Sequence, residues 1–520
     1  MPYAITSPHH SATEAGASVL ADGGSAIEAM VAAAAAIAVA YPHMNGLGGD
    51  GFWLISPAGR KPIAIDATGC AAADASIEGY RALGLNTIPH RGGRAALTSA
   101  GAVAGWQAAL DLLPSHRPLA DLLAPARDLA RSGIRVTESL AAASTKVADE
   151  FTTLAGYQAI FAPDERPLAQ GEQLRNLKLA DTLDHLARAG LNDFYQGDVG
   201  QSLARSLDKA GSPLTRRDLQ SYRVRQPQAL TTATRDGDLF NFPAPTQGQA
   251  SLMILALFER VRDQATSEAD RVHLLIECTK LAFRARDRYT ADPNHLPPAY
   301  FDQLDETHLD ALAHQVQLKR AAPWPHPAEP GDTVWLGCVD ADGTMVSYIQ
   351  SLYWEFGSGV VCPDTGIVWT NRGLSFKLDE HHPNRLRPGA RPFTTLNPAY
   401  ADLNNGDRLV YGTMGGEGQP QTQAALMMRH LMEGRSLEDS IADGRWLLGR
   451  TWGDNSNNLK LEADLAARIA SDLQQRGHDL VSVPEHSEMM GHAGAIRRYA
   501  NGRLEAATDP RSDGRALVQD

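Results

Sequence analysis

The N-terminal part of the chain has the polar and apolar pattern of two helices joined by a turn. Ser11 and Ser25 are each followed three residues later by a glutamate, which is the capping-box arrangement of a helix N-terminus. Gly23 and Gly24 separate the two segments, where a left-handed C-cap is expected. The second segment is rich in alanine and should end before Pro42. The pattern therefore predicts two helices, of which the second is buried.

The spacing of the other apolar positions predicts a helical part followed by a strand-rich part. Helical spacing prevails from about residue 98 to residue 320, and the clearest predicted helices are Ala102–Leu113, Leu119–Arg131 (interrupted at Pro125), Ser251–Asp263 and Asp270–Tyr289. Two further helices are predicted near Gln421–Met432 and Ala463–Arg476. The strand-like runs are Phe52–Ser56, Lys61–Ala67, Thr333–Asp340 and Thr344–Leu352. The chain therefore combines predicted helices and predicted strands.

Composition and charge exclude several classes of partner. The 520 residues are 43% hydrophobic and 21% charged, with a net charge of -13 and no basic stripe. A nucleic-acid or anionic-membrane partner is therefore not expected. The most apolar stretch, Met30–Ala40, is shorter than the roughly 20 residues that a membrane span needs. The N-terminus lacks the basic and apolar regions of a secretion signal, so a cytoplasmic location is predicted.

Cysteine usage gives no sign of a metal or disulfide framework. The four cysteines are far apart and form no C-x-x-C pair; they are Cys70, Cys278, Cys338 and Cys362. Zinc ribbons, iron–sulfur ligation and disulfides are therefore disfavoured. We expect neither a metal nor a cofactor.

The cluster Gly46–Gly51 superficially resembles a nucleotide-binding loop. A dinucleotide fingerprint follows a strand and opens a helix, whereas this cluster follows a predicted helix and opens a predicted strand. A tight turn that packs against other backbone is the better interpretation.

The junction Asp332–Thr333 lies between a proline-rich segment and a predicted strand. Four prolines crowd into Ala321–Pro330, which predicts an exposed, extended linker. Thr333 then opens a strand. A threonine at a strand start is usually structural, because β-branched residues favour strands.

Hairpin geometry adds a second hydroxyl group. If Gly343 occupies the left-handed position of a three-residue loop, Thr333 lies opposite Ser351. Two hydroxyl groups would then be side by side at the open end of the hairpin, although such pairs also occur for purely structural reasons.

Gly415 and Gly416 precede the helix predicted near Gln421–Met432. Backbone N–H groups at a glycine-rich helix entry can form an oxyanion hole, and an ordinary strand-to-helix turn is the alternative. Thr394 and Thr395 place two more hydroxyl groups next to each other.

Taken together, these landmarks resemble the gamma-glutamyltranspeptidase family of N-terminal nucleophile hydrolases. The likeness extends over nearly the whole chain. The matching segments, in order, are Ala15–Ala29, Pro42–Phe52, Asp332–Thr333, Phe356–Gly359, Gly415–Gly416 and Asp509–Arg511. The resemblance implies the α+β class, with a four-layer αββα sandwich, and a precursor that cleaves its own backbone before a threonine.

The resemblance also implies the parts of the enzyme. Cleavage of the Asp332–Thr333 bond would give a large subunit, 1–332, and a small subunit, 333–520, which share one structural domain. A dimer of such heterodimers is possible within this family. Thr333 would be the nucleophile and its freed α-amino group the base, with Ser351 orienting both. Gly415 and Gly416 would form the oxyanion hole, and Thr394 and Thr395 match family serines near the substrate carboxylate.

The chain departs from the family pattern where the acyl group binds. Thr68 stands where transpeptidases have the arginine that holds the glutamyl α-carboxylate. Tyr353, Arg372 and Ser375 stand at the positions that hold the α-amino group. An ammonium is disfavoured beside Arg372, whereas a carboxylate is favoured. This matches a branch of the family that hydrolyses oxamate to oxalate and ammonia.

Several alternatives stay open. Arg372 can instead be a structural arginine paired with Asp379 or Glu380, and Arg91 is a weaker second candidate for an anion anchor. The substrate can be a γ-glutamyl donor or, as in cephalosporin acylases, a dicarboxylic acyl amide. An unprocessed, non-catalytic binding protein is the alternative from another class.

Overall fold

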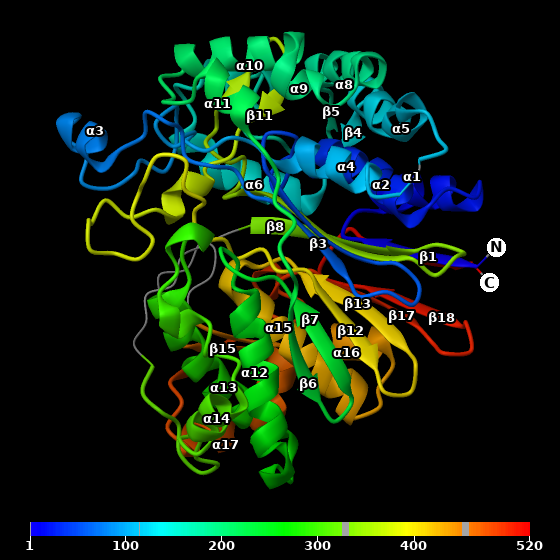
Figure 1. Cartoon of the computed structure of the whole chain (residues 1–520), viewed down its shortest axis with the longest axis vertical. Coiled ribbons are helices and arrows are strands. Elements are labelled where there is room, and N and C mark those ends of the chain that lie inside the picture. The colour runs from blue at the N-terminus through cyan, green and yellow to red at the C-terminus, as the bar shows by residue number, and fades with distance from the viewer. Residues whose placement is uncertain (1, 114, 325–331, 450–456, 520) are drawn as a thin grey trace.

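Two six-stranded sheets lie face to face between helical layers in the computed structural model (Figure 1). The structure describes residues 2–113, 115–324, 332–449 and 457–519. The first sheet has the order β19 (Arg515–Gln519), β1 (Tyr3–Ser7), β8 (Asp332–Val339), β9 (Met345–Tyr353), β2 (Asp50–Ser56) and β3 (Ile63–Ala67). The second has the order β18 (Leu504–Thr508), β17 (Ala493–Arg498), β13 (Arg408–Thr413), β12 (Ala399–Leu403), β7 (Gly237–Asn241) and β6 (Leu230–Thr234).

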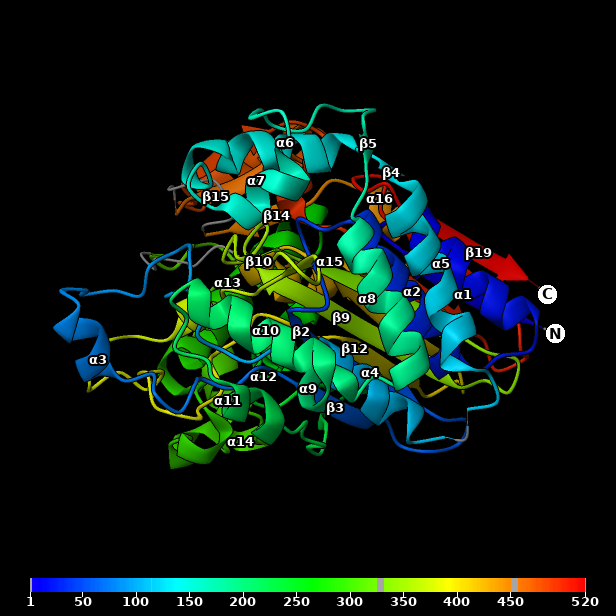
Figure 2. The ribbon, with the colours of Figure 1, turned by 90° about the horizontal axis from the view of Figure 1, so that it is seen from above.

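Helices cover the outer face of each sheet. Those over the first sheet include α1 (His10–Ala21), α2 (Ala26–Ala40), α4 (Ala102–Leu110), α5 (Leu119–Ser132) and α8 (Leu177–Ala189), and Figure 2 shows them from above. Those over the second include α12 (Gly248–Val261), α13 (Glu268–Tyr289), α15 (Gln419–Met427) and α16 (Leu437–Ala442).

The remaining elements are shorter or peripheral. They are α3 (Ile77–Ala82), β4 (Ile134–Arg135), α6 (Glu138–Val147), α7 (Ala155–Phe161), β5 (Gln173–Leu174), α9 (Asp193–Gln196), α10 (Asp198–Lys209), α11 (Arg216–Ser221), α14 (Glu306–Ala313), β10 (Val361–Cys362), β11 (Ile367–Val368), β14 (Trp446–Leu448), β15 (Leu459–Glu462), α17 (Ala463–Gln475) and β16 (Leu480–Val483).

Each interface between layers has its own apolar core. Phe52, Trp335 and Ile349 of the first sheet meet Val410 and Ile496 of the second in the core between the sheets. Two larger cores lie between each sheet and its helices. Because buried sheet faces require apolar cover on both sides, this layering stabilises both sheets. The four-layer αββα sandwich and the α+β class are confirmed.

The predicted helices are present, with several ends displaced by two or three residues, and two local predictions about them are wrong. Ser25 makes the expected capping box of α2, and Gly23 has a left-handed φ of 81°. The capping box expected at Ser11 is wrong, because α1 begins at His10 and the ring of His9 caps it. The interruption expected at Pro125 is also wrong. The helix α5 continues through that proline because one face, which includes Leu122 and Ala126, is buried against the core.

The hairpin of β8 and β9 has the expected register. Gly343 has a φ of 81° in the connecting turn, and Val334 pairs with Gln350. The pairing shifts between Asp332 and Val334, so Thr333 lies at an irregularity of the strand. The linker expected at Ala321–Pro330 lies outside the described residues from residue 325 onward.

The glycine-rich turn Gly46–Gly51 packs against other backbone, as predicted. A Cβ atom at Gly48 would overlap the carbonyl oxygen of Val368, and one at Gly49 would overlap that of Ser351. The turn is therefore pressed against the end of β9, where the predicted site lies.

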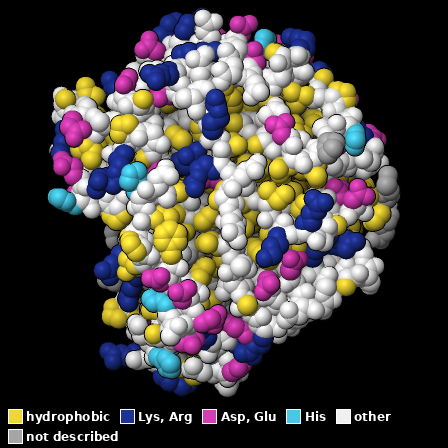
Figure 3. All heavy atoms as spheres, in the orientation of Figure 1, with side chains coloured by type: hydrophobic (Ala, Val, Ile, Leu, Met, Phe, Trp, Pro, Cys, Tyr) yellow, Lys and Arg dark blue, Asp and Glu magenta, His cyan; other side chains and the backbone are white. Residues whose placement is uncertain are grey.

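Charged side chains of both signs are interspersed on the face drawn in Figure 3. Among the described helices, none combines the length and the apolar character that crossing a membrane requires.

Trp335 fills the space between the sheets through contacts with glycine. Its indole N–H donates to Ser347 Oγ at 2.9 Å, and its ring lies where Cβ atoms at Gly412 and Gly494 would be. We expect Gly412→Ala to lower the free energy of unfolding by about 1–3 kcal/mol, because the rigid ring cannot move aside. Denaturant unfolding measures the effect. Gly79→Ala, at an exposed helical position where the added Cβ would be near only Ser76 Oγ, at 3.3 Å, is the control and should destabilise far less. Equal stability of the two variants would contradict the prediction.

Candidate active site

Thr333 and Ser351 meet at the open end of the β8–β9 hairpin. Trp335 and Ile349, each two residues from this point along β8 and β9, lie in the core between the sheets. Thr333 Oγ1 donates to Ser351 Oγ at 3.3 Å, and both residues are fully buried. The two hydroxyl groups predicted to be neighbours are therefore in contact.

The backbone is continuous at the predicted cleavage bond. Asp332 and Thr333 are consecutive residues of β8, and Asp332 pairs with Tyr353 of β9. In the uncleaved chain the nitrogen of Thr333 is part of an amide.

Arg372 is the cation of the site. It begins the short 3-10 helix Arg372–Ser375, and its Nη2 donates to Ser351 Oγ at 3.2 Å. Its guanidinium lies over the ring of Tyr353, 4.2 Å from the centroid. The Nη1 atom is buried and has no hydrogen-bond partner among the described residues. Arg372 therefore combines two fixed contacts with one unused donor group.

The anionic partner of Arg372 is Asp50. Arg372 Nε donates to Asp50 Oδ2 at 2.9 Å, and both side chains are fully buried. The alternative partners considered from the sequence, Asp379 and Glu380, are wrong; those residues are near in sequence, whereas the real partner comes from β2.

Sequence reasoning missed Asp50, which opens β2 directly opposite Ser351. Its Oδ1 accepts the backbone N–H of Gly69 at 2.8 Å. Burial raises the pKa of Asp50, and the charge of Arg372 opposes that rise. The sequence offered one signal for this residue: it is an acidic residue inside a glycine-rich turn that leads into a buried strand.

Tyr353 has an unusual backbone conformation beside this pair. Its φ of 83° is left-handed, which is costly for an aromatic residue. Its backbone N–H donates to Ser351 Oγ at 2.8 Å. Thr333, Tyr353 and Arg372 therefore all donate hydrogen bonds to Ser351 Oγ.

The glycine and threonine pairs form a second group. Gln247, which the sequence reasoning missed, donates through Nε2 to the carbonyl groups of Thr395 and Gly416, both at 2.8 Å. Gly415 has a φ of 115°, and the hydroxyl group of Thr395 is buried without a partner among the described residues. Gln247 therefore holds the two predicted segments together.

The two groups belong to facing sheets. Thr333 is two residues before Trp335 in β8, and Gly415 is two residues after the end of β13. Trp335 packs on Gly412 of β13, which brings the two strands together near the predicted nucleophile.

Arg91 is engaged by protein groups. Its guanidinium donates to the Glu150 carboxylate at 2.5 Å and to the carbonyl groups of Glu355 and Gly357 at 2.8 and 2.6 Å. These contacts support the turn after Tyr353, and they favour Arg372 over Arg91 as the anion anchor.

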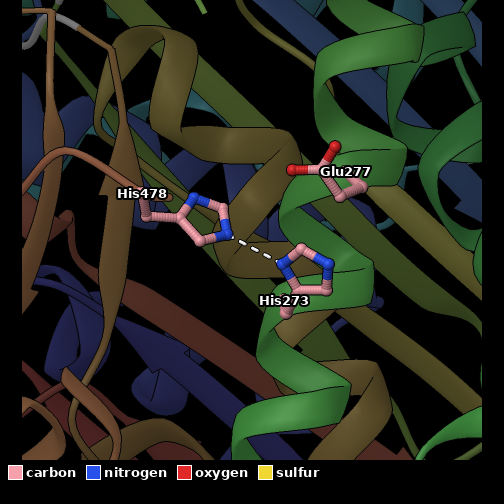
Figure 4. Close-up of side chains that lie close together, drawn as sticks. All are labelled: His273, Glu277 and His478. Atoms are coloured by element: carbon pink, nitrogen blue, oxygen red, sulfur yellow. Dashed lines mark hydrogen bonds between the residues drawn. The ribbon is translucent and has the colours of Figure 1, made fainter. Parts of the chain in front are cut away.

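His273, Glu277 and His478 form a buried group with the residue types of a metal site (Figure 4). His273 Nδ1 and His478 Nε2 are 2.8 Å apart, and His273 Nε2 lies 2.8 Å from the carbonyl oxygen of Gln317. Burial lowers the pKa of His273, and it lowers that of His478 to about 3. Both rings are therefore neutral, which suits metal binding but also suits the hydrogen bond between them.

The surroundings of this group fit a cation poorly. Lys280 Nζ lies 2.7 Å from Glu277 Oε1, and the N–H of Ala322 donates to Oε2 at 2.9 Å. An ion would have to displace the ammonium or lie beside it. We therefore assign a structural role to the group.

Comparisons with known proteins agree with the architecture. The family model described as gamma-glutamyltranspeptidase matches residues 12–519. The oxamate amidohydrolase proenzyme of Klebsiella pneumoniae is 50% identical, over 98% of this chain and 97% of that protein. The glutathione hydrolase-like YwrD proenzyme of Bacillus subtilis is 35% identical, over 99% and 98%.

A solved structure extends the likeness to three dimensions. The cephalosporin acylase from Bacillus halodurans superposes with a TM-score of 0.91 at 30% identity, covering 99% of this chain and 95% of that one. The sandwich, the site at the hairpin end and these full-length matches lead to one conclusion: the chain belongs to the gamma-glutamyltranspeptidase family and is a hydrolase that acts on C–N bonds.

Proposed function

We propose that the protein is an autoprocessed N-terminal-threonine amidohydrolase that hydrolyses a small anionic amide such as oxamate. The observation that carries the proposal is the contact of Thr333 Oγ1 with Ser351 Oγ, to which Arg372 also donates. A hydroxyl nucleophile, its orienting group and a cation for an anionic acyl group are then adjacent. The similarity to an oxamate amidohydrolase proenzyme supports the same activity.

Activation is proposed to occur by cleavage of the Asp332–Thr333 bond. It would give a large subunit, 1–332, and a small subunit, 333–520, within one structural domain. The relatives named as proenzymes support this step. Release of Asp332 from its pairing with Tyr353 would open the space beside Arg372.

The freed α-amino group of Thr333 would act as the base. The ordinary pKa of such a group is about 7.7–8.0, so it can take the Oγ1 proton near neutral pH. The oxygen then attacks the amide carbonyl, and the N–H groups of Gly415 and Gly416 stabilise the oxyanion. The C–N bond breaks, and ammonia leaves with the transferred proton. Water hydrolyses the ester, which releases the dicarboxylate and restores Thr333.

The charge of the acyl subsite supports an anionic substrate. Arg372 Nη1 is unused in the hydrogen-bonding of the described residues and suits a carboxylate. Tyr353 would hold the guanidinium in place, and Thr394 and Thr395 would supply hydroxyl groups on the opposite side. The ammonium of a γ-glutamyl donor would lie beside a cation, which disfavours that class.

Ammonia release from oxamate, measured beside nitroanilide release from a γ-glutamyl anilide, tests the proposal. We expect turnover of oxamate and at least about 100-fold lower kcat/KM for the anilide, because one misplaced charge costs several kcal/mol in a desolvated site. Turnover of the anilide with none of oxamate would refute the substrate.

A glutaryl amide belongs in the same assay, because the superposition on a cephalosporin acylase favours dicarboxylic acyl amides as the second candidate.

Denaturing electrophoresis decides between an enzyme and an unprocessed binding protein. Two fragments, the smaller beginning at Thr333, support processing, and one intact band in active protein contradicts it.

A further inference from the structure

The buried Asp50–Arg372 pair does more than balance charge. Two of the three nitrogen atoms of the Arg372 guanidinium are committed, Nε to Asp50 and Nη2 to Ser351. Only Nη1 lacks a partner among the described residues. A carboxylate that binds here must therefore approach one defined nitrogen.

Asp50 is itself fixed from three directions. Its strand pairs it with Ser351, its Oδ1 accepts the N–H of Gly69, and its side chain is fully buried. The glycine-rich turn before it is pressed against the carbonyl of Ser351 through Gly49. The carboxylate cannot change rotamer without losing these contacts, so Arg372 cannot swing away from Ser351.

The distance from the anchor to the nucleophile is short. Contacts of 3.3 and 3.2 Å link Thr333 Oγ1 to Ser351 Oγ and Ser351 Oγ to Arg372 Nη2, so these outer two atoms lie within about 6.5 Å of each other. Nη1 is bonded to the same guanidinium carbon as Nη2 and therefore lies within about 9 Å of Thr333 Oγ1. An extended chain gains about 1.2 Å per bond. In oxamate the carboxylate is bonded directly to the amide carbon, which suits this span. Each methylene group between them moves the carboxylate farther past the anchor.

We propose that Asp50 is a positioning residue that locks Arg372 against Ser351 and so limits the acyl group to very short dicarboxylic monoamides. The inference rests on the proposed function, since it assigns the acyl subsite to Arg372. The length of the acyl group is limited by the distance between Arg372 and Thr333, whereas γ-glutamyl donors are excluded by the positive charge of Arg372.

A series of monoamides that differ only in length tests the limit with the natural chain. The probes are oxamate, malonamate, succinamate and glutaramate, each assayed for ammonia release. We expect kcat/KM to fall steadily, reaching at least about 100-fold below oxamate at succinamate, as when a hydrogen bond to a charged group is lost. Similar values for oxamate and glutaramate would overturn the limit and leave the proposed function standing. If processed enzyme hydrolyses none of the four, both fail.

Asp50→Asn tests the positioning role. Asparagine keeps the size but removes the charge, so Arg372 is no longer locked. We expect kcat/KM for oxamate to fall about 100-fold and the preference for oxamate over succinamate to shrink about tenfold or more. A merely structural role would lower the amount of active enzyme and leave that preference unchanged, which would overturn the assignment.

Glu277→Gln is the matched control, because it neutralises another buried acid in an ion pair, with Lys280. It should reduce stability without altering the preference for length. Kinetic constants are normalised to the processed fraction on a denaturing gel. If Asp50→Asn does not accumulate, the length series of the natural enzyme still decides the limit on acyl length.

Discussion

Thr333→Ala is expected to yield a single uncleaved chain with no detectable amidohydrolase activity. The side-chain oxygen is required twice in the proposed chemistry, first to attack its own preceding carbonyl and then to attack the substrate. Alanine removes it in both steps. Nucleophile removal in comparable hydrolases costs about 10⁴-fold or more. Denaturing electrophoresis and ammonia release from oxamate measure the two effects separately.

Thr333→Ser is the matched control for that experiment. Serine keeps the hydroxyl group that contacts Ser351 and loses only a methyl group. We expect cleavage to persist at a reduced rate, with activity that appears in step with the cleaved fraction. Full activity of an uncleaved Thr333→Ala chain would eliminate the N-terminal-threonine mechanism. Failure of the alanine variant to fold is checked by its unfolding transition against that of the serine variant.

Local features of the fold were predictable from the sequence. Capping at Ser25 and the turn at Gly343 depend on residues only a few positions apart, so the helix start and the hairpin register follow from local geometry. The register in turn brought Thr333 and Ser351 together before any long-range contact was considered. The cap at Ser11 failed for the opposite reason: His9 is held by a bridge to Asp513, at the far end of the chain.

The unpredicted parts of the site are long-range contacts between polar groups. Asp50 and Arg372 are 322 positions apart, and Gln247 reaches carbonyl groups 148 and 169 positions away. None of these three residues carries a periodic signal, because a buried polar side chain is defined by its partner and not by its neighbours in sequence. Asp379 and Glu380 were plausible partners for Arg372 only because they are near it in the chain.

Long-range pairing also explains why one oxygen organises the site. Ser351 Oγ receives hydrogen bonds from Arg372, from the backbone N–H of Tyr353 and from Thr333 Oγ1. The first two donors are held by the buried ion pair and by the backbone, so they fix the position of the oxygen that Thr333 contacts. A strained Tyr353 backbone is tolerated because these bonds compensate for it.

Arg372→Met alone is expected to destabilise the chain more than the simultaneous replacement of Arg372 and its partner Asp50. With the arginine gone, the carboxylate of Asp50 is buried without a cation, which costs about 3–5 kcal/mol in comparable pairs. The double variant Asp50→Leu with Arg372→Met removes both charges, so most of that loss should be recovered. Denaturant unfolding is measured in the Thr333→Ala background, where every variant is one uncleaved chain and the free energies are comparable.

The pH dependence of Arg372→Met supplies an independent check of the same pair. Burial already raises the pKa of Asp50, and removal of Arg372 takes away the charge that opposes the rise. The folded variant then holds a proton at pH values where the unfolded chain, with an aspartate pKa of about 3.9, has released it. Its free energy of unfolding, relative to the Thr333→Ala chain with Arg372 intact, should therefore increase as the pH is lowered from neutral toward the unfolded-state value. A difference that stays constant over that range, together with additive effects in the double variant, would show that the two side chains are not coupled.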